Sequence, residues 1–198
     1  RTFENYYSVT DEKYNKNEFE KNVLKENRLI TKGIEVGHIF YFGDKYSKPL
    51  NASVDFQEGK KDFVKMGSYG IGVSRLVGAI IEAKYNDKDE IMKWPIAVSP
   101  YDIAIIPLVS KNDNSNLEKG KNIYNFLKDK GLEPILDDTE ENFSSKIKKF
   151  NLIGIPFQII LGKKSDGDKL EFKELGNTSQ YLTLNQIADL INKQKSKI

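Results

Sequence analysis

Two apolar segments in the second half of the chain, the continuous run Ile103–Leu108 and the largely apolar Pro156–Leu161, constrain the fold most strongly. A strand that is apolar on both faces has to be covered on both faces, which is typical of a parallel sheet flanked by helices. Helix-like and strand-like segments alternate around these runs. We therefore expect residues 100–198 to form a small α/β domain with a mixed sheet.

The remaining elements of this half follow from spacing and from glycines. Helices are expected over residues 117–127, closed by Gly131, over 143–150, ending before Gly154, and over 187–191. Shorter strands are expected over residues 133–136, 170–173 and 181–183.

The sequence of residues 1–99 predicts an antiparallel, α+β arrangement. Ile34–Phe42 is apolar and aromatic, as in a buried strand, and a helix is possible between Glu12 and Lys25. Asn51–Gln57 alternates with period two and can return as Asp62–Met66, which predicts a hairpin. Two prolines, in Trp94-Pro95 and Ser99-Pro100, disfavour helix, and we place a domain boundary between residues 99 and 100.

Composition excludes several classes of protein. The 38% hydrophobic and 30% charged residues are typical of a globular protein, and no apolar run reaches the roughly 20 residues of a membrane span. The chain has no cysteine, which excludes disulfides and thiolate metal sites and is compatible with a reducing cytoplasm. The net charge of +2 gives no sign of a nucleic-acid partner. Because the chain begins at Arg1, we interpret it as part of a longer protein.

The segment Gly67-Ser-Tyr-Gly-Ile-Gly-Val-Ser-Arg75 carries the clearest chemical signal. Because its glycines have no side chains, a flat ligand could lie directly against the backbone of the strand. Arg75 would begin the next helix, where the helix dipole favours an anion and a guanidinium adds a planar fork. A dinucleotide-binding loop fits poorly, because Arg75 occupies the third small-residue position. Glycines that merely allow tight packing are an equally good explanation of the segment taken alone.

Apolar residues follow this segment at the spacing of a core-facing helix. They are Val73, Leu76, Val77, Ile80 and Ile81.

Several motifs together resemble one family. Gly67–Leu76 is similar to motif 3 of the class II aminoacyl-tRNA synthetases, in its bacterial prolyl form. Gly33–Gly43 resembles the strand that lines the proline pocket, and Trp94–Pro100 resembles the exit from the catalytic domain. Asp137-Asp138 and Leu152–Gly162 resemble the class IIa anticodon-binding domain.

This resemblance covers residues 33 to 190 in the family's order. It implies that residues 1–99 are the end of a class II catalytic domain and residues 100–198 an anticodon-binding domain. It also suggests the short form of the family found among relatives of the alphaproteobacteria, which lacks the editing insertion.

The resemblance also implies roles for individual residues. Arg75 corresponds to the catalytic arginine that contacts ATP, and Gly70 and Gly72 would form the floor under adenine and ribose. His38, Ser68 and Glu35 would line the proline pocket, although a lone histidine in an apolar strand is more often a core residue. Ser68 replaces a frequent cysteine, and Asp44 stands where relatives usually carry a small hydroxyl residue.

For the second half, the resemblance implies tRNA contacts by Asp137, Asp138, Glu171 and Lys173. Three lysines on one expected helix would form a basic patch suited to phosphates, although such charge runs are usually solvated faces. They are Lys146, Lys148 and Lys149. Thr139 replaces a usual arginine, and a glycine expected near Asn142 is absent.

The function implied is that of a proline–tRNA ligase. The full enzyme would activate proline with ATP and Mg²⁺, charge tRNA(Pro), and work as a cytoplasmic homodimer without a membrane or a metal site in this chain. Motifs 1 and 2 are absent, so we expect these 198 residues alone to be inactive. Two alternatives stay open, namely a non-catalytic RNA-binding or accessory protein derived from a synthetase, and a synthetase for another amino acid such as threonine or histidine.

Overall fold

The structure is a computed structural model, and it describes residues 14–29, 33–109, 113–162 and 168–197. The chain divides into two compact units, residues 1–35 and 36–198, which are described separately.

The first unit contains one short α-helix, α1 (Lys16–Asn22), followed by a 3-10 turn, η3 (Lys25–Asn27). Asn15 caps α1, because its side chain accepts hydrogen bonds from the backbone N–H groups of Asn17 and Glu18. The helix predicted in this region is therefore present, although Glu12 lies outside the described residues.

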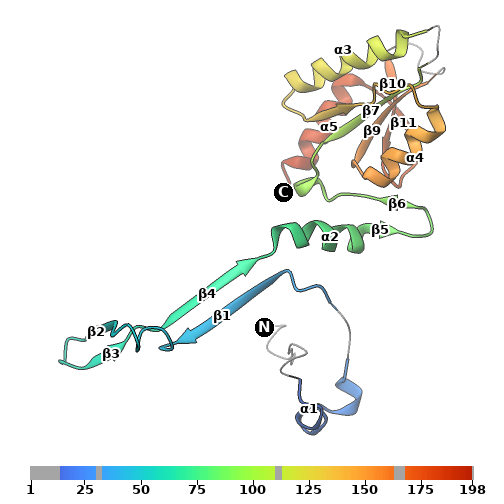
Figure 1. Cartoon of the computed structure of the whole chain (residues 1–198). Coiled ribbons are helices and arrows are strands. Elements are labelled where there is room, and N and C mark those ends of the chain that lie inside the picture. Colours follow the sequence, from blue (N-terminus) through green and yellow to red (C-terminus); the bar gives the residue numbers. More distant parts are fainter. Residues whose placement is uncertain (1–13, 30–32, 110–112, 163–167, 198) are drawn as a thin grey trace. The chain divides into compact units, whose positions relative to one another are not determined.

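The second unit opens with a long antiparallel ribbon (Figure 1). Its strands are β1 (Gly37–Gly43) and β4 (Met66–Ile71), and the connection between them carries the small hairpin of β2 (Ser53–Asp55) and β3 (Lys61–Phe63). The β2–β3 pair confirms the hairpin predicted over Asn51–Gln57 and Asp62–Met66.

The two faces of this ribbon follow from its register. Ile39 pairs with Tyr69, and Tyr41 pairs with Gly67, so the large side chains of Ile39, Tyr41 and Tyr69 share one face. They are largely exposed, with Ile39 and Tyr69 each at 81%. We call this set, together with Ile71, the outer face.

Helix α2 (Val73–Lys84) follows β4, as predicted. A short hairpin that the sequence did not predict comes next, formed by β5 (Tyr85–Asn86) and β6 (Ile91–Met92). None of the α2 residues is buried, so the expectation of a core-facing stripe is wrong for the chain as it stands. The helix is amphipathic, and its apolar side is only partly covered, because Leu76 and Ile80 are half-buried while Val73, Val77 and Ile81 are exposed.

After the 3-10 turn η4 (Ile96–Val98), a five-stranded mixed sheet occupies the rest of the chain. Its strands lie in the order β11-β10-β9-β7-β8, with β7 parallel to both β8 and β9, and β10 antiparallel to both β9 and β11. The strands are β7 (Ile103–Pro107), β8 (Pro134–Leu136), β9 (Phe157–Leu161), β10 (Lys169–Glu174) and β11 (Gln180–Thr183).

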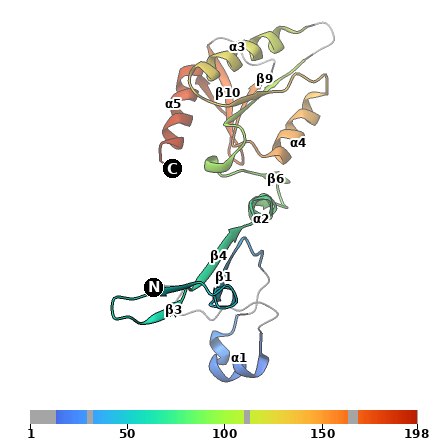
Figure 2. The same cartoon turned by 60° about the vertical axis from the view of Figure 1, so that its left-hand side comes forward.

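Three helices cover this sheet in two layers (Figure 2). On the first face, α3 (Ser115–Asp129) and α5 (Leu184–Lys195) pack over a core that includes Ile103, Phe157 and Phe172. On the second face, α4 (Phe143–Ile153) packs over Ala104 and Ile106 through Phe150. The two central apolar strands are therefore buried on both faces, which confirms the expected α/β fold.

Helix ends match their sequence signals. Gly131 follows α3 with a φ of +77°, and Gly154 caps α4 with a φ of +83°, a region that favours glycine. Thr183 and Gln186 form a capping box at the start of α5.

Candidate functional sites

The ribbon gathers three of the predicted pocket and ATP residues on one face. His38 is opposite Gly70, and Phe40 is opposite Ser68, so these four residues share the face that we call the inner face. The rings of His38 and Phe40 lie 4.3 Å apart between centroids. A small polar side chain, an imidazole and a bare stretch of backbone thus lie side by side.

Gly70 and Gly72 differ in what surrounds them. A Cβ atom added at Gly70 would meet nothing within 4 Å, so the backbone there is open to a flat group. A Cβ atom at Gly72 would lie 3.2 Å from the Cβ atom of Arg75. Gly72 therefore allows the close approach of the first turn of α2, which carries Arg75.

Arg75 lies in that first turn, three residues after the cap residue Gly72, and it is exposed. The helix N-terminus offers unpaired N–H groups and a positive dipole end, and the guanidinium adds a full charge. This combination suits a phosphate. Glu35 is exposed and ends the first unit, so its role in the pocket stays a prediction.

Asp44 forms an ionic clip beside the ribbon. Its Oδ2 atom lies 3.0 Å from Nζ of Lys48 and 3.2 Å from Nζ of Lys65, the residue before β4. Hydrogen bonds from these two lysines lower the pKa of Asp44. These two ion pairs give Asp44 a local structural role.

In the second half, Asp137 forms the centre of a buried ionic cluster. Its Oδ1 atom accepts hydrogen bonds from the backbone N–H and the hydroxyl of Thr139. Nζ of Lys149 lies 3.0 Å from Oδ2, and Nζ of Lys146 lies 3.4 Å from Oδ1. Asp137 and Lys146 are both buried.

The expected basic patch is therefore wrong in one respect. Lys146 is fully buried and does not present its ammonium to solvent. Lys148 is exposed, and Lys149 is partly exposed but shared between Asp137 and Glu141. The solvent-facing charge on α4 is smaller than the sequence suggested.

The environment of Asp137 shifts its titration. Burial would raise the pKa of its carboxyl group, but hydrogen bonds from Thr139, the contact with Lys149 and the charge of Lys146 together lower that pKa. The same contact with Asp137 raises the pKa of Lys149.

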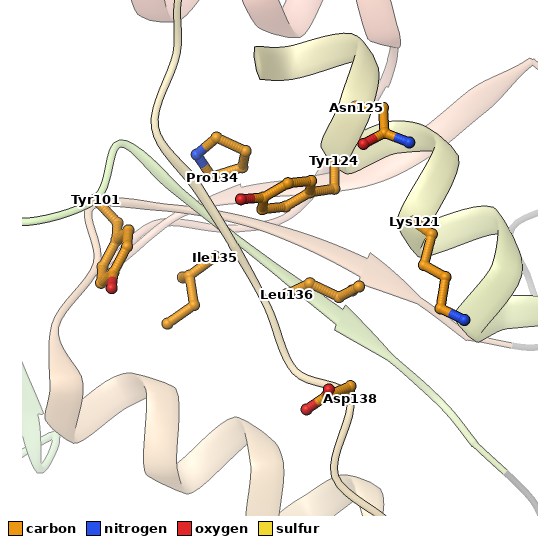
Figure 3. Close-up of a pocket in the computed structure, with 8 residues that line it drawn as sticks. All are labelled: Tyr101, Lys121, Tyr124, Asn125, Pro134, Ile135, Leu136 and Asp138. Atoms are coloured by element: carbon orange, nitrogen blue, oxygen red, sulfur yellow. The ribbon is translucent and has the colours of Figure 1, made fainter.

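Asp138, the next residue, lies at a groove along the free edge of β8 (Figure 3). The groove has a volume of about 510 Å³. Helix α3 contributes Lys121 and Tyr124, and Tyr101 precedes β7. Carboxylate, ammonium and aromatic groups of this kind can hold an unstacked base by hydrogen bonding and stacking.

Glu171 and Lys173 project from β10 onto the second face of the sheet, two residues apart on the same strand. Tyr181 of β11 is opposite Glu171 and is 48% exposed, so an aromatic ring borders this pair. Gln158 is opposite Lys173, is fully buried, and has no hydrogen-bond partner for either polar atom of its amide. The sequence alone did not single out Tyr181 or Gln158, because only the register brings them beside the predicted residues.

Within the residues that the structure describes, no group of three or more histidine, aspartate and glutamate side chains could hold a metal ion. No described helix is long and apolar enough to cross a membrane.

Comparison with known proteins agrees with this arrangement. A family model described as an anticodon binding domain matches residues 102–194, which include all five strands of the mixed sheet. A proline–tRNA ligase of Pelagibacter ubique is 66% identical over 197 residues, which is 100% of this chain and 44% of that protein. Over its whole length the chain is similar to part of a proline–tRNA ligase.

Two further proline–tRNA ligases show similar relationships. That of the Wolbachia of Brugia malayi is 51% identical over 75% of this chain and 34% of its own length, and that of Bartonella tribocorum is 46% identical over 81% and 35%. The chain thus spans less than half the length of these curated relatives and matches their carboxy-terminal part. The recognition of the prolyl family from its motifs is confirmed, whereas the residue roles and the boundary at residue 99 stay predictions.

Proposed function

We propose that this chain is the part of a proline–tRNA ligase that supplies the motif 3 side of the ATP site, one wall of the proline pocket and the anticodon-binding domain. The observation that carries the proposal is the register of the ribbon. It places His38, Ser68 and Gly70 on one face, directly before the helix turn that bears Arg75.

In the first step, a carboxylate oxygen of proline attacks the α-phosphorus of ATP. A new P–O bond forms, the bond to the bridging oxygen breaks, and pyrophosphate leaves with the electron pair. Negative charge gathers on the phosphates, where fixed positive charge is most effective. Arg75 fits the role of an ATP contact, the open backbone at Gly70 can support the adenosine, and His38 can hydrogen-bond the amino acid.

In the second step, a hydroxyl of the terminal adenosine of tRNA attacks the carbonyl carbon of the prolyl-adenylate and AMP leaves. The anticodon-binding domain has to hold the distant end of the same tRNA. Asp138 in the β8 groove and the Glu171–Lys173 pair beside Tyr181 are the groups that we assign to this task. Lys149 can add a phosphate contact, while Lys146 and Asp137 support the loop from inside.

Mg²⁺ normally accompanies ATP in such a reaction, where it neutralises phosphate charge. The residues described here do not offer a ligand cluster for it, so we assign it no ligand in this chain. The proposed substrates are ATP, proline and tRNA(Pro), and the proposed working form is a cytoplasmic homodimer.

Exchange of pyrophosphate into ATP by the full-length protein tests the proposal, because it reports the first step without tRNA. We expect exchange with proline and not with threonine or histidine, and charging of tRNA(Pro). Exchange that depends on another amino acid, or RNA binding without any exchange, would contradict the proposal in favour of another synthetase or an accessory protein. The 198-residue chain alone is expected to bind RNA without catalysing exchange.

A further inference from the structure

The segment that leads into the anticodon-binding domain is fastened to it by backbone, side-chain and ionic contacts. The backbone N–H of Trp94 donates to the carbonyl of Gly154 at 3.0 Å, and its indole Nε1 donates to the carbonyl of Ile153 at 2.9 Å. One residue earlier, Nζ of Lys93 lies 2.6 Å from Oε1 of Glu174 at the end of β10. We call this set of contacts the Trp94 clasp.

The clasp provides hydrogen-bond donors for backbone carbonyl groups at the end of a helix, where an unsatisfied carbonyl costs free energy. Carbonyl groups in the last turn of an α-helix have no partner within the helix. Trp94 supplies partners for two carbonyls at this end of α4, those of Ile153 and Gly154. The Lys93–Glu174 pair is about one-third exposed on each side, so it is only partly screened by solvent.

Close packing beneath the clasp leaves little freedom. Met92 is 3% exposed. A Cβ atom added at Gly154 would lie 2.6 Å from the carbonyl oxygen of Met92, so only glycine allows this approach. Ile81 and Tyr85 line a small pocket of about 220 Å³ together with Met92, Trp94 and Ile153, so residues at the end of α2 border the same place.

Helix α4 connects the clasp to the candidate tRNA contacts. Its 11 residues span about 16 Å, with the clasp at the carboxy-terminal end. Earlier on the same helix, Lys146 and Lys149 contact Asp137, the neighbour of Asp138. Glu174 likewise lies one residue beyond Lys173 on β10. The clasp therefore holds the carboxy-terminal ends of α4 and β10, the two elements that carry these candidate RNA contacts.

We propose that Lys93, Trp94, Gly154 and Glu174 are positioning residues for tRNA charging, which fix the RNA-holding domain to the chain leading from the motif 3 helix. This inference rests on the proposed function. A loose clasp would leave adenylate formation intact, because that step needs no tRNA. It would also leave the RNA surface intact, but the charging step would lose the fixed distance between the two ends of the bound tRNA.

The test uses the full-length protein with Lys93→Glu, Glu174→Lys and the double swap, together with Trp94→Phe, which keeps an aromatic ring but removes the indole donor. Lys128→Glu is the matched control, because Lys128 forms a comparable ion pair with Glu133, at 2.9 Å, that does not involve the clasp. Each variant is measured in pyrophosphate exchange, in charging of whole tRNA(Pro), and in binding to an isolated anticodon stem-loop.

We expect Lys93→Glu to lower kcat/KM for tRNA by roughly 3- to 30-fold, the range typical of coupling between sites. Exchange and stem-loop affinity should stay within twofold of the parent protein, and the double swap should recover most of the loss. Trp94→Phe should show the same pattern more weakly, and Lys128→Glu should not show it.

Normal charging by both Lys93→Glu and Trp94→Phe would overturn the inference. An equal loss in all three measurements would also overturn it, because it would indicate damage to the fold. If the parent protein shows neither proline-dependent exchange nor charging, the proposed function itself fails. That result differs from an active parent protein whose clasp variants charge tRNA normally, which contradicts only the role of the clasp.

Discussion

The ammonium group of Lys146 lies 3.4 Å from Oδ1 of Asp137, and neither side chain is accessible to solvent. This pair joins the N-terminal half of α4 to the segment that follows β8. A buried ion pair of this kind adds little net stability over an apolar pair, but breaking it leaves an uncompensated charge.

Asp137→Asn should therefore destabilise the chain by about 3–5 kcal/mol, because Lys146 would lose its buried counter-ion. The measurement is urea unfolding of the 198-residue chain, followed by circular dichroism. Asp138→Asn is the matched control, since it changes the exposed neighbour in the same way and should stay within about 0.5 kcal/mol. Similar midpoints for both variants would show that the buried pair is not maintained in solution.

The same carboxylate should contribute to the loss of stability in acid. The pKa of Asp137 is lowered in the folded chain, so the folded state holds its proton less tightly than the unfolded state, whose pKa is about 3.9. Its contribution is complete above that unfolded pKa and is lost as the pH falls below it toward the folded pKa. Urea midpoints at pH 7, 5, 4 and 3 should fall more steeply in the parent chain than in Asp137→Asn. Parallel profiles would contradict this assignment.

Gly154→Ala should be more damaging than Gly131→Ala, although both glycines have positive φ angles. A Cβ atom at Gly131 meets nothing within 4 Å, so only backbone strain of about 1 kcal/mol is expected there. At Gly154 the added atom also meets the backbone of Met92 at 2.6 Å, which adds steric strain of about 1–3 kcal/mol. Thermal unfolding of the two variants gives the difference directly, and equal shifts would show that Met92 moves away at no cost.

Lys173→Ala should weaken binding of a tRNA(Pro) anticodon stem-loop if Lys173 contacts a phosphate. The plot of log K against log salt concentration should then become shallower by about 1. Lys128→Ala removes an exposed lysine of α3, on the other face of the sheet, and is expected to leave the slope unchanged. The titration uses the 198-residue chain at several salt concentrations. An unchanged slope for Lys173→Ala would remove Lys173 from the interface.

Arg75→Lys should slow pyrophosphate exchange by the full-length protein by about 10²-fold or more, because a lysine keeps the charge but loses the planar fork. Lys84→Ala, at the other end of the same helix, is the control for general effects on α2 and should stay within a few-fold. An Arg75→Lys enzyme with normal exchange would exclude a contact between Arg75 and ATP that the first step needs.

Much of the fold was predictable because its signals are local. The apolar runs of β7 and β9 and the glycines after α3 and α4 each identify an element without reference to a partner. The β5–β6 hairpin was missed because strands of two residues carry no periodicity. The stripe on α2 was recognised as amphipathic, but periodicity does not show which surface covers it.

The candidate sites were less predictable, because they depend on which residues meet in space. Lys146 has the spacing of the buried stripe, between Phe143 and Phe150, yet its charge suggested a solvent-facing role. Only the structure shows that Lys146 forms an ion pair with the buried Asp137. The inner face of the ribbon was anticipated through family motifs, whereas Tyr181 beside Glu171 needed the strand register.

The outer face of the ribbon has a practical consequence for anyone who handles this chain. Ile39, Tyr41, Tyr69 and Ile71 form an apolar strip on a two-stranded ribbon that pairs with no other strand among the described residues, a surface that favours aggregation in water. We therefore expect this strip to promote association of the 198-residue chain in solution. Replacing Ile39 and Tyr69 by lysine should keep the chain dispersed at the concentrations that spectroscopy needs.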